Sequence, residues 1–316
     1  MSLIDVRDLG RTFVVRKRAG TFTRTRNQVR AVHDLSFQVE AGEMIGYIGP
    51  NGAGKSTTIK MLTGILVPTS GELRVAGLEP SRERTRLARR IGVVFGQRTT
   101  LWWDLPLRDS FELLQKIYRV EPARHRRTLQ EYVELLDLGD LLDTPVRQLS
   151  LGQRMRGDIT AALLHEPEIL YLDEPTIGLD VISKGRLREF LRTLNAERGT
   201  TLLLTTHDLQ DIEALCDRVI VIDRGTAVFD GPLDDLQRRG ESQRTLVVDL
   251  VDEAPPISVA GATTRKVDGP RQWLSFPAGA SAAPIVAAVA AAYDVADLSI
   301  HEPDIEDVIR DLYAGV

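Results

Sequence analysis

The chain has 316 residues, of which 43% are hydrophobic and 27% charged, and its formal net charge is −5. This composition is that of a globular protein with a sizeable core and excludes a wholly disordered chain. The single cysteine, Cys216, excludes an intramolecular disulfide, and no uninterrupted apolar run reaches the roughly 18 residues of a membrane span. The first residues lack the charged start and apolar stretch of a secretion signal, so we expect a cytoplasmic protein.

A basic segment lies near the N-terminus of this otherwise acidic chain. Seven basic residues and no acidic residue occur from Arg11 to Arg30. The negative net charge argues against general nucleic-acid binding, and we expect no nucleic-acid partner. The segment itself is either a solvated surface hairpin or a contact for anionic lipid headgroups or an acidic partner, and the sequence leaves both possibilities open.

Short apolar runs rich in β-branched residues alternate with helical patterns up to about residue 230. Their unbroken hydrophobicity predicts the strands of a parallel sheet covered on both faces. A helical stretch over 108–142, interrupted at Pro122 and Pro145, separates the second run from the third, and further helices are expected after Ser150 and Val181. A hairpin arm is expected over 225–232. The five predicted strands are Met44–Ile48, Ile91–Phe95, Ile169–Leu172, Thr201–Thr205 and Val219–Ile222.

The composition changes near Arg239 and Gly240, where we expect a domain boundary. Strand-like pieces follow at 245–251 and 272–276, then an alanine-rich helix within 278–293 and a strand at 295–300. The C-terminal residues Ile305, Val308, Ile309 and Leu312 recur with the spacing of one helix face. The sequence therefore predicts two domains, residues 1–240 and a small α+β domain of residues 241–316.

A glycine-rich motif follows the first predicted strand. GPNGAGKST, residues 49–57, satisfies G-x-x-x-x-G-K-[ST] in the strand–loop–helix context that this motif requires. Its glycines allow backbone N–H groups to surround phosphate oxygens, and the following helix directs its positive end at them. Lys55 would reach the β- and γ-phosphates and the Ser56 hydroxyl would bind Mg²⁺. The motif predicts ATP binding through Gly49, Asn51, Gly52, Ala53, Gly54, Lys55, Ser56 and Thr57.

Two adjacent acids end the third predicted strand, in the sequence ILYLDEP. On a strand next to the phosphate loop, Asp173 would lie near Mg²⁺. Glu174 would lie beyond it, where a carboxylate can polarise water for attack on the γ-phosphate.

The motifs together carry a resemblance. GPNGAGKST, Gln97, LSLGQ (149–153), ILYLDEP, IGLD (177–180) and His207 appear in the order found in the ATP-binding cassette (ABC) ATPases. The chain resembles this family over about residues 1–235. The resemblance implies an α/β P-loop fold with a parallel-sheet core, a β-subdomain, and a helical subdomain at about 98–165.

The resemblance also implies roles for single residues. Gln97 would contact Mg²⁺ and the attacking water, and His207 would bind the γ-phosphate and hold Glu174 in line. Phe13 matches the aromatic that stacks on adenine, unless it is a core residue. Ser150, Gly152 and Gln153 would bind the ATP of a second subunit in a head-to-tail dimer, either a homodimer or a pair with a related ATPase, with Asp180 at the junction. Leu151 departs from the glycine common at its position.

The segment after Gln97 is similar to that of ATPases paired with ABC-2-type permeases, which are mostly bacterial exporters. Adjacent tryptophans point to opposite sides of an extended chain, so we expect Leu101, Trp102 and Trp103 to form part of a permease-binding groove. The implied function is that of an ATPase subunit, peripheral on the inner face of the membrane, which drives export through integral membrane permeases. The alternative is a soluble ABC ATPase of the DNA-repair or translation type.

Overall fold

The computed structural model describes residues 2–18, 24–96, 98–206, 208–240, 243–301 and 308. The chain divides into two compact units, Met1–Gly231 and Pro232–Val316. The boundary therefore falls before a helix, α8 (Leu233–Gly240), that the composition shift had placed in the first domain. No helix among the described residues is both long and apolar enough to cross a bilayer.

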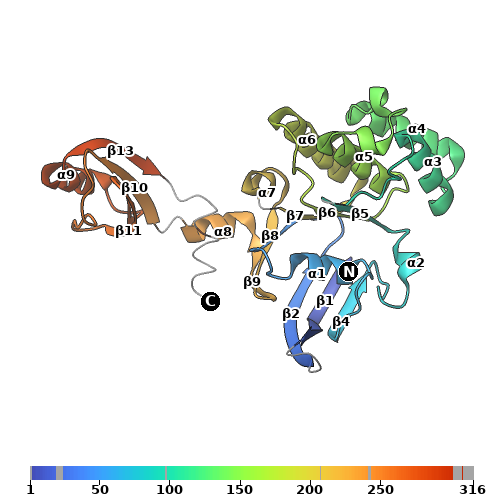
Figure 1. The fold of residues 1–316 in the computed structure, drawn as a ribbon, viewed down its shortest axis with the longest axis horizontal. Helices are drawn as coiled ribbons and strands as arrows, with labels where there is room; N and C mark the ends of the chain where they lie inside the picture. Colours follow the sequence, from blue (N-terminus) through green and yellow to red (C-terminus); the bar gives the residue numbers. More distant parts are fainter. Residues whose placement is uncertain are drawn as a thin grey trace. The chain divides into compact units, whose positions relative to one another are not determined.

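A six-stranded sheet forms the centre of the first unit, in the order β5-β6-β7-β3-β8-β9 (Figure 1). The pairs β5–β6, β6–β7, β7–β3 and β3–β8 are parallel, as the unbroken apolar runs predicted. All five predicted strands are confirmed, as is the arm over 225–232. The strands are β3 (Met44–Ile48), β5 (Ile91–Phe95), β6 (Ile169–Asp173), β7 (Thr201–Thr205), β8 (Arg218–Asp223) and β9 (Thr226–Pro232).

Helices are present after the glycine-rich loop, within 108–142, after Ser150 and after Val181, as the sequence predicted, whereas α2 and α7 were not predicted. Within the stretch expected over 108–142, α4 begins at Pro122 because proline suits the first turn and the Glu121 side chain caps that turn. Ser150 and Asp180 cap α5 and α6 in the same way. The helices are α1 (Lys55–Leu62), α2 (Arg84–Leu87), α3 (Leu107–Tyr118), α4 (Pro122–Leu135), α5 (Leu151–Leu163), α6 (Val181–Arg198) and α7 (Leu209–Leu215), with short 3₁₀ helices at Gly139–Leu141 and Val146–Gln148.

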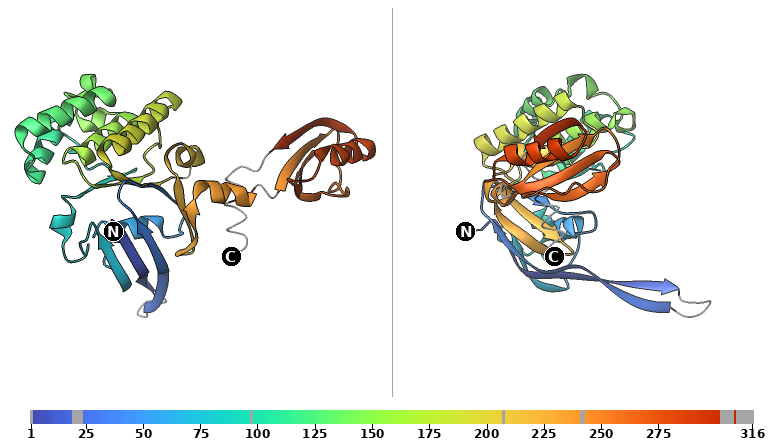
Figure 2. Two further views of the ribbon diagram at one scale, coloured as in Figure 1. Left: turned by 180° about the vertical axis from the view of Figure 1, so that it is seen from behind. Right: turned by 90° about the vertical axis from the view of Figure 1, so that its left-hand side faces the viewer.

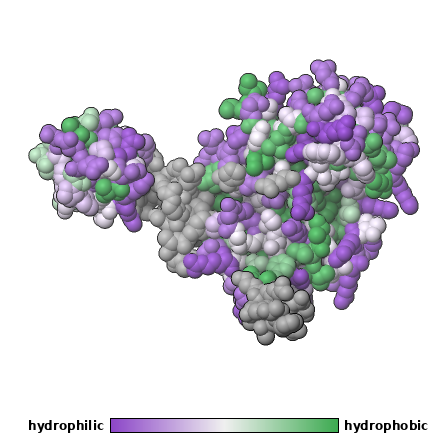
Figure 3. Space-filling model, viewed as in Figure 1, coloured by the Kyte–Doolittle hydropathy of each residue, from purple (hydrophilic) through white to green (hydrophobic). Residues whose placement is uncertain are grey.

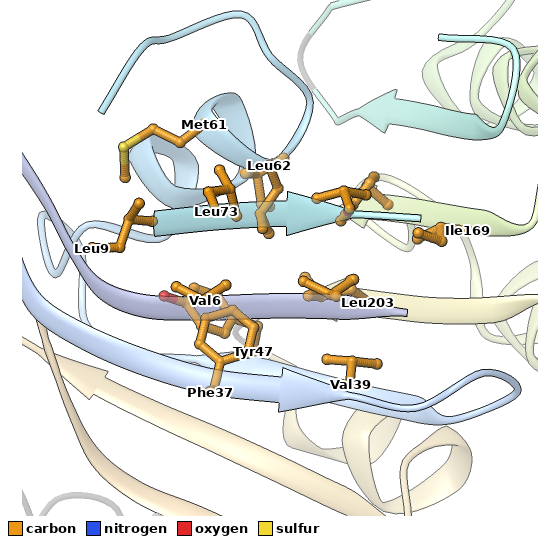
Figure 4. Close-up of a cluster of buried hydrophobic side chains, with 14 of the residues drawn as sticks. Val6, Leu9, Phe37, Val39, Tyr47, Met61, Leu62, Leu73, Ile169 and Leu203 are labelled. Atoms are coloured by element: carbon orange, nitrogen blue, oxygen red, sulfur yellow. The ribbon is translucent and has the colours of Figure 1, made fainter. Parts of the chain in front are cut away.

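An antiparallel sheet completes the first unit, in the order β2-β1-β4. It consists of β1 (Ile4–Arg18), β2 (Arg24–Val39) and β4 (Ser70–Val75), and it is the β-subdomain that the resemblance implied. One buried cluster joins this sheet to the parallel sheet and to α1 (Figure 4). Its members include Val6 of β1, Phe37 of β2, Tyr47 of β3, Met61 of α1 and Leu203 of β7. The shared core fixes the loop between β3 and α1 relative to both sheets.

Besides α8, the described residues of the second unit form an antiparallel sheet of four strands, in the order β11-β12-β10-β13, and one further helix. Its core includes Leu246, Phe276, Ile285 and Val289. Hydrophilic residues dominate the face of this unit that Figure 3 shows. The predicted helix over 305–313 lies outside the described residues except for Val308, which is buried. The elements are β10 (Gln243–Leu250), β11 (Thr263–Asp268), β12 (Arg271–Pro277), α9 (Ala282–Ala292) and β13 (Val295–His301), of which β11 had no clear sequence signal.

Candidate active site

The glycine-rich loop connects β3 to α1, as its motif predicted. Gly54 at the start of α1 has φ 109°, and a Cβ at this position would lie 2.6 Å from the carbonyl oxygen of Ala31. Both features require glycine. Because Gly54 has no side chain to cap α1, backbone N–H groups of the first turn remain available to an anion.

Lys55 folds back over its own loop. Its Nζ donates hydrogen bonds to the carbonyl oxygens of Gly49 and Pro50, the second at 3.2 Å. Burial lowers the pKa of Lys55, and the charges of Glu174 and Asp173 oppose that shift. A phosphate group entering the loop would replace neutral carbonyl partners of the ammonium with anionic oxygens, which form stronger hydrogen bonds.

A cavity of about 620 Å³ opens in front of this loop. It lies where the carboxyl ends of β5 and β6 and the start of α1 come together, the usual ligand position in a parallel sheet. The loop and both strand-end acids therefore face the same space. Its lining consists of Ala31, Asn51, Gly52, Gly54, Lys55, Ser56, Thr57, Lys60, Ile65, Phe95, Gly96, Arg98, Asp173, Glu174 and Ile177.

Two of the predicted loop residues support the cavity without lining it. Gly49 accepts the hydrogen bond from Lys55. The Ala53 side chain is buried, its N–H donates to the Pro50 carbonyl oxygen at 3.1 Å, and its own carbonyl accepts from Gly225 N–H at 2.9 Å. These contacts fix the backbone of the loop beside the cavity.

Neighbouring strands hold the two acids at the cavity. The Thr205 hydroxyl at the end of β7 donates to an Asp173 carboxylate oxygen, and Gly96 N–H donates to the Asp173 carbonyl at 2.7 Å. Glu174 has φ 56°, and its N–H donates to the Thr205 carbonyl at 2.8 Å. This left-handed turn, uncommon for glutamate, ends β6 and directs the chain past the cavity. Thr205 was not predicted as a site residue, although its position at the end of a predicted strand was available.

The LSLGQ motif, which we call the signature, forms the start of α5, the signature helix. The Ser150 hydroxyl accepts from Gln153 N–H at 3.2 Å, and the Gln153 side chain accepts from Ser150 N–H at 2.9 Å. This reciprocal pair is a capping box. Ser150 and Gln153 are thereby fixed at a helix N-terminus, which favours anions.

Leu151 packs against the IGLD loop of its own chain. A Cβ at Gly178 would lie 2.3 Å from Cδ2 of Leu151, and Gly178 itself has φ 73°. In the reverse direction, a Cβ at Gly152 would lie 2.8 Å from Cδ2 of Leu179. The two loops are therefore interlocked by reciprocal leucine–glycine contacts. The side chain of Leu151, which departs from the family pattern, therefore packs in the space left by the missing side chain of Gly178.

Asp180 closes the IGLD loop by capping α6. Its carboxylate accepts from the Ser183 N–H at 3.0 Å and from the Ser183 hydroxyl at 2.6 Å, and these hydrogen bonds lower the pKa of Asp180. The next two residues, Val181 and Ile182, are 86% and 71% exposed. The first turn of α6 thus presents an apolar surface beside Asp180.

A buried carboxylate fixes the segment after β5 to α5. Asp158 is 5% exposed and accepts from the Thr99 hydroxyl at 2.9 Å and from the Thr100 N–H at 2.9 Å. Burial raises the pKa of Asp158, and these hydrogen bonds oppose the shift. The segment leaving the cavity is in this way tied to the helix that Ser150 begins.

The two tryptophans of this segment are at the surface, and Leu101 is not. Trp102 is 37% and Trp103 50% exposed, and the Arg154 guanidinium lies 5.4 Å from the Trp103 ring centre. Leu101 is 5% exposed and lies next to Gly157 of α5. The expectation that Leu101 contributes to an open groove is therefore corrected, because its side chain belongs to the core and supports the segment from inside.

One predicted ATP-binding residue lies away from the cavity, and two predicted catalytic residues lie outside the described residues. Phe13 of β1 is half-buried beneath the guanidinium of Arg11, 4.8 Å from its ring centre, and does not line the cavity. Gln97 and His207 lie outside the described residues. The structure describes the residues beside them, Gly96 and Asp208, and the predicted roles of Gln97 and His207 stay predictions.

A charged network that was not predicted from the sequence lies next to the loop after Glu174. Asp211 is fully buried and accepts from the Thr176 hydroxyl at 2.5 Å and from Arg188 Nε at 2.7 Å. Lys184 donates to Asp208 at 2.6 Å. Asp211 could have been recognised as an acid on the inner face of a short amphipathic helix.

Comparisons with known proteins identify the family of this chain. The family model described as "ABC transporter" matches residues 32–177. The daunorubicin/doxorubicin resistance ATP-binding protein DrrA of Streptomyces peucetius is 36% identical over 264 residues, which cover 78% of this chain and 79% of that protein. The Nod factor export ATP-binding protein I of Paraburkholderia xenovorans is 40% identical over 201 residues, which cover 63% of this chain and 65% of that protein.

A solved structure is similar as well. It is a dimeric, post-hydrolysis state of an ATP-binding cassette bound to ADP and Pi, 26% identical, with a TM-score of 0.64 over 73% of this chain and 98% of that one. The predicted fold and the predicted ATPase activity are thereby confirmed, as is the resemblance to ATP-binding subunits of exporters. The chain binds and hydrolyses ATP, and it belongs to the ATP-binding proteins of the ABC transporter family.

Proposed function

We propose that this chain is the ATPase subunit of an ABC-2-type exporter. It would lie on the cytoplasmic face of a membrane and drive separate permease subunits. The observation that carries the proposal is the shared cavity, in which the phosphate loop and the acids of β6 face one another. The relatives named for drug resistance and Nod factor export support the direction of transport.

The cavity residues would have separate roles in ATP hydrolysis. The loop N–H groups and Lys55 would hold the β- and γ-phosphates. Ser56 and Asp173 line the same cavity and offer the oxygen ligands that Mg²⁺ prefers, with the remaining positions left to phosphates and water. Bound there, Mg²⁺ would neutralise phosphate charge. Glu174 would orient and polarise the attacking water.

The signature and IGLD loops would act on the ATP of a second subunit. Ser150 and Gly152 stand at a helix N-terminus, and Asp180 lies next to the exposed apolar pair Val181 and Ile182. An exposed apolar surface beside capped helix ends suits a subunit interface. The similar cassette structure is dimeric, which supports assembly of this chain as a dimer. In that dimer, two ATP molecules would lie between the subunits.

The tryptophan segment would receive the permease. Trp102 and Trp103 are exposed, aromatic, and accompanied by Arg154, a composition typical of interface anchors. The Asp158 hydrogen bonds fix this segment to α5, so a displacement of the tryptophans by the permease would be transmitted to the signature helix.

The hydrolytic role is tested with Glu174→Gln. We expect ATP binding to persist while turnover falls by about 10²-fold or more, because the amide cannot polarise water as a carboxylate does. Glu72→Gln, an exposed acid on β4, is the matched control and should leave both unchanged. Near-wild-type turnover of Glu174→Gln would refute the assignment.

The transport role is tested separately. The tagged chain is extracted from its native membranes in detergent, and the co-purifying chains are identified by mass. A polytopic membrane protein is expected. Ribosomal or DNA-repair partners without a membrane protein would leave the ATPase chemistry intact and overturn the exporter assignment.

A further inference from the structure

The N-terminal hairpin extends past the sheet to which it belongs. Strand β1 pairs with β4 only as far as Gly10, opposite Ser70. From Arg11 to Arg18 it pairs with β2 alone, ending at the pair Arg18–Arg24. We call residues 11–18 and 24–30 the basic arm. Figure 2 shows the ribbon of β1 and β2 extending away from the rest of the first unit.

The pairing register concentrates charge on the basic arm. Arg16 is opposite Arg26 and Arg18 is opposite Arg24, and Arg30 is opposite Thr12. Since successive strand positions alternate between faces, all five of these arginines occupy positions on one face of the ribbon. No acidic residue occurs from Arg11 to Arg30 to neutralise them.

Such an arm is poorly suited to stand alone in water. Like charges directly opposite each other on two strands are destabilising, and a two-stranded ribbon is only marginally stable by itself. The arm also exposes apolar side chains, since Val14, Val15 and Val29 are 57%, 41% and 46% exposed. Both the repulsion and the apolar exposure would be relieved by a surface that is anionic and partly apolar.

We propose that the basic arm docks on an anionic lipid surface. The arm is a thin ribbon whose cations are spread along its length and interspersed with valines, which matches the headgroup region of a bilayer, where anions can rearrange around each cation. A folded acidic partner would need carboxylates fixed opposite each arginine position. The proposal rests on the proposed function only for the presence of a membrane, because lipid binding is measurable without a permease.

The size of the effect follows from the charge. Each lysine or arginine near an anionic membrane contributes a factor of about five to partitioning, so the loss of four arginines lowers partitioning by about 600-fold. Binding should also weaken steeply as salt is added, because exposed charges are screened.

The test uses the full chain and co-sedimentation with vesicles. Vesicles of phosphatidylcholine alone are compared with vesicles that also contain phosphatidylglycerol. One variant carries Arg→Gln at 16, 18, 24 and 26. The matched control carries Arg→Gln at 84, 89, 126 and 127, exposed positions of the same unit, and loses the same charge. Urea unfolding and ATP binding of each variant verify that the chain remains folded.

Binding of the wild type and the control only to anionic vesicles, with loss in the arm variant, supports the proposal. Equal binding of all three chains, or no binding of the wild type to anionic vesicles, overturns it. If the arm variant keeps vesicle binding but loses a co-purifying permease, the arm docks on protein and the lipid proposal fails. Conversely, a chain that binds anionic vesicles but recovers no permease would leave this inference standing while the exporter assignment falls.

Discussion

Gly178→Ala tests the contact between the signature and IGLD loops. The added Cβ would lie 2.3 Å from Cδ2 and 2.9 Å from Cγ of Leu151, closer than any van der Waals contact. Gly178 also has φ 73°, which an L side chain adopts only with strain. The substitution therefore combines a backbone cost with a steric cost, and only the steric cost depends on Leu151.

The two costs can be bounded separately. Alanine in the left-handed region costs about 1 kcal/mol. Leu151 can relieve the clash by rotating toward solvent, since it is already 38% exposed, so the steric cost cannot exceed the burial it gives up. Full burial of a leucine is worth about 1.5–3 kcal/mol, which makes that loss about 1–2 kcal/mol here. We expect Gly178→Ala to destabilise the first unit by about 2–3 kcal/mol in total.

A double-mutant cycle with Leu151→Gly isolates the contact. In the Leu151→Gly background Gly178→Ala should cost only about 1 kcal/mol, which leaves a coupling energy of about 1–2 kcal/mol. Urea unfolding is followed by tryptophan fluorescence in a Trp273→Phe background, so that only Trp102 and Trp103 of the first unit report. The same cost of Gly178→Ala in both backgrounds would refute the contact.

Three further predictions follow from single sites. Ser150→Asp keeps a capping side chain, so we expect it to unfold at the same urea concentration as the wild type. Its negative charge should abolish ATP-driven dimerisation, which size-exclusion chromatography measures. Unchanged dimerisation would show that Ser150 does not contact the phosphates bound by the partner subunit. Asp158→Ala leaves the hydroxyls and N–H of Thr99 and Thr100 without their acceptor and should destabilise the first unit by about 1–3 kcal/mol in urea unfolding. Burial lowers the pKa of His125 and His165, so the unfolded chain binds more protons than the folded chain, and stability should fall as the pH drops below about 6.5. His125→Leu should reduce the slope of stability against pH in urea unfolding. An unchanged slope would contradict this role of His125.

Much of the first unit could be predicted because its signals are local. A strand buried on both faces is predominantly apolar, and β3, β5 and β7 match the predicted runs to the residue. The glycine-rich loop is likewise defined by residues that are adjacent in the chain. Asp173 and Glu174 could be placed beside it because parallel strands end at the same edge of a sheet.

The unpredicted parts depend on distant contacts. Strand β11 alternates weakly and carries mostly exposed residues, so its position becomes clear only from its pairing with β12. Leu101 looked like a surface anchor because it precedes two tryptophans. Its burial follows from Gly157, a residue of another element whose missing side chain makes room for it.

The leucine in LSLGQ departs from the family pattern, and its role becomes clear only from its contacts in the fold. From the sequence alone, Leu151 would hinder the close approach of a phosphate to the backbone that a glycine at this position would permit. In the fold its side chain is directed at Gly178, while Leu179 lies against Gly152, so each loop supplies the glycine that the other loop's leucine requires. Because Ser150 and Asp180 cap the helices on either side of this contact, the two loops are held at a fixed separation. In the proposed dimer both loops face the ATP of the partner subunit, and the interlock would make them approach it as one rigid element.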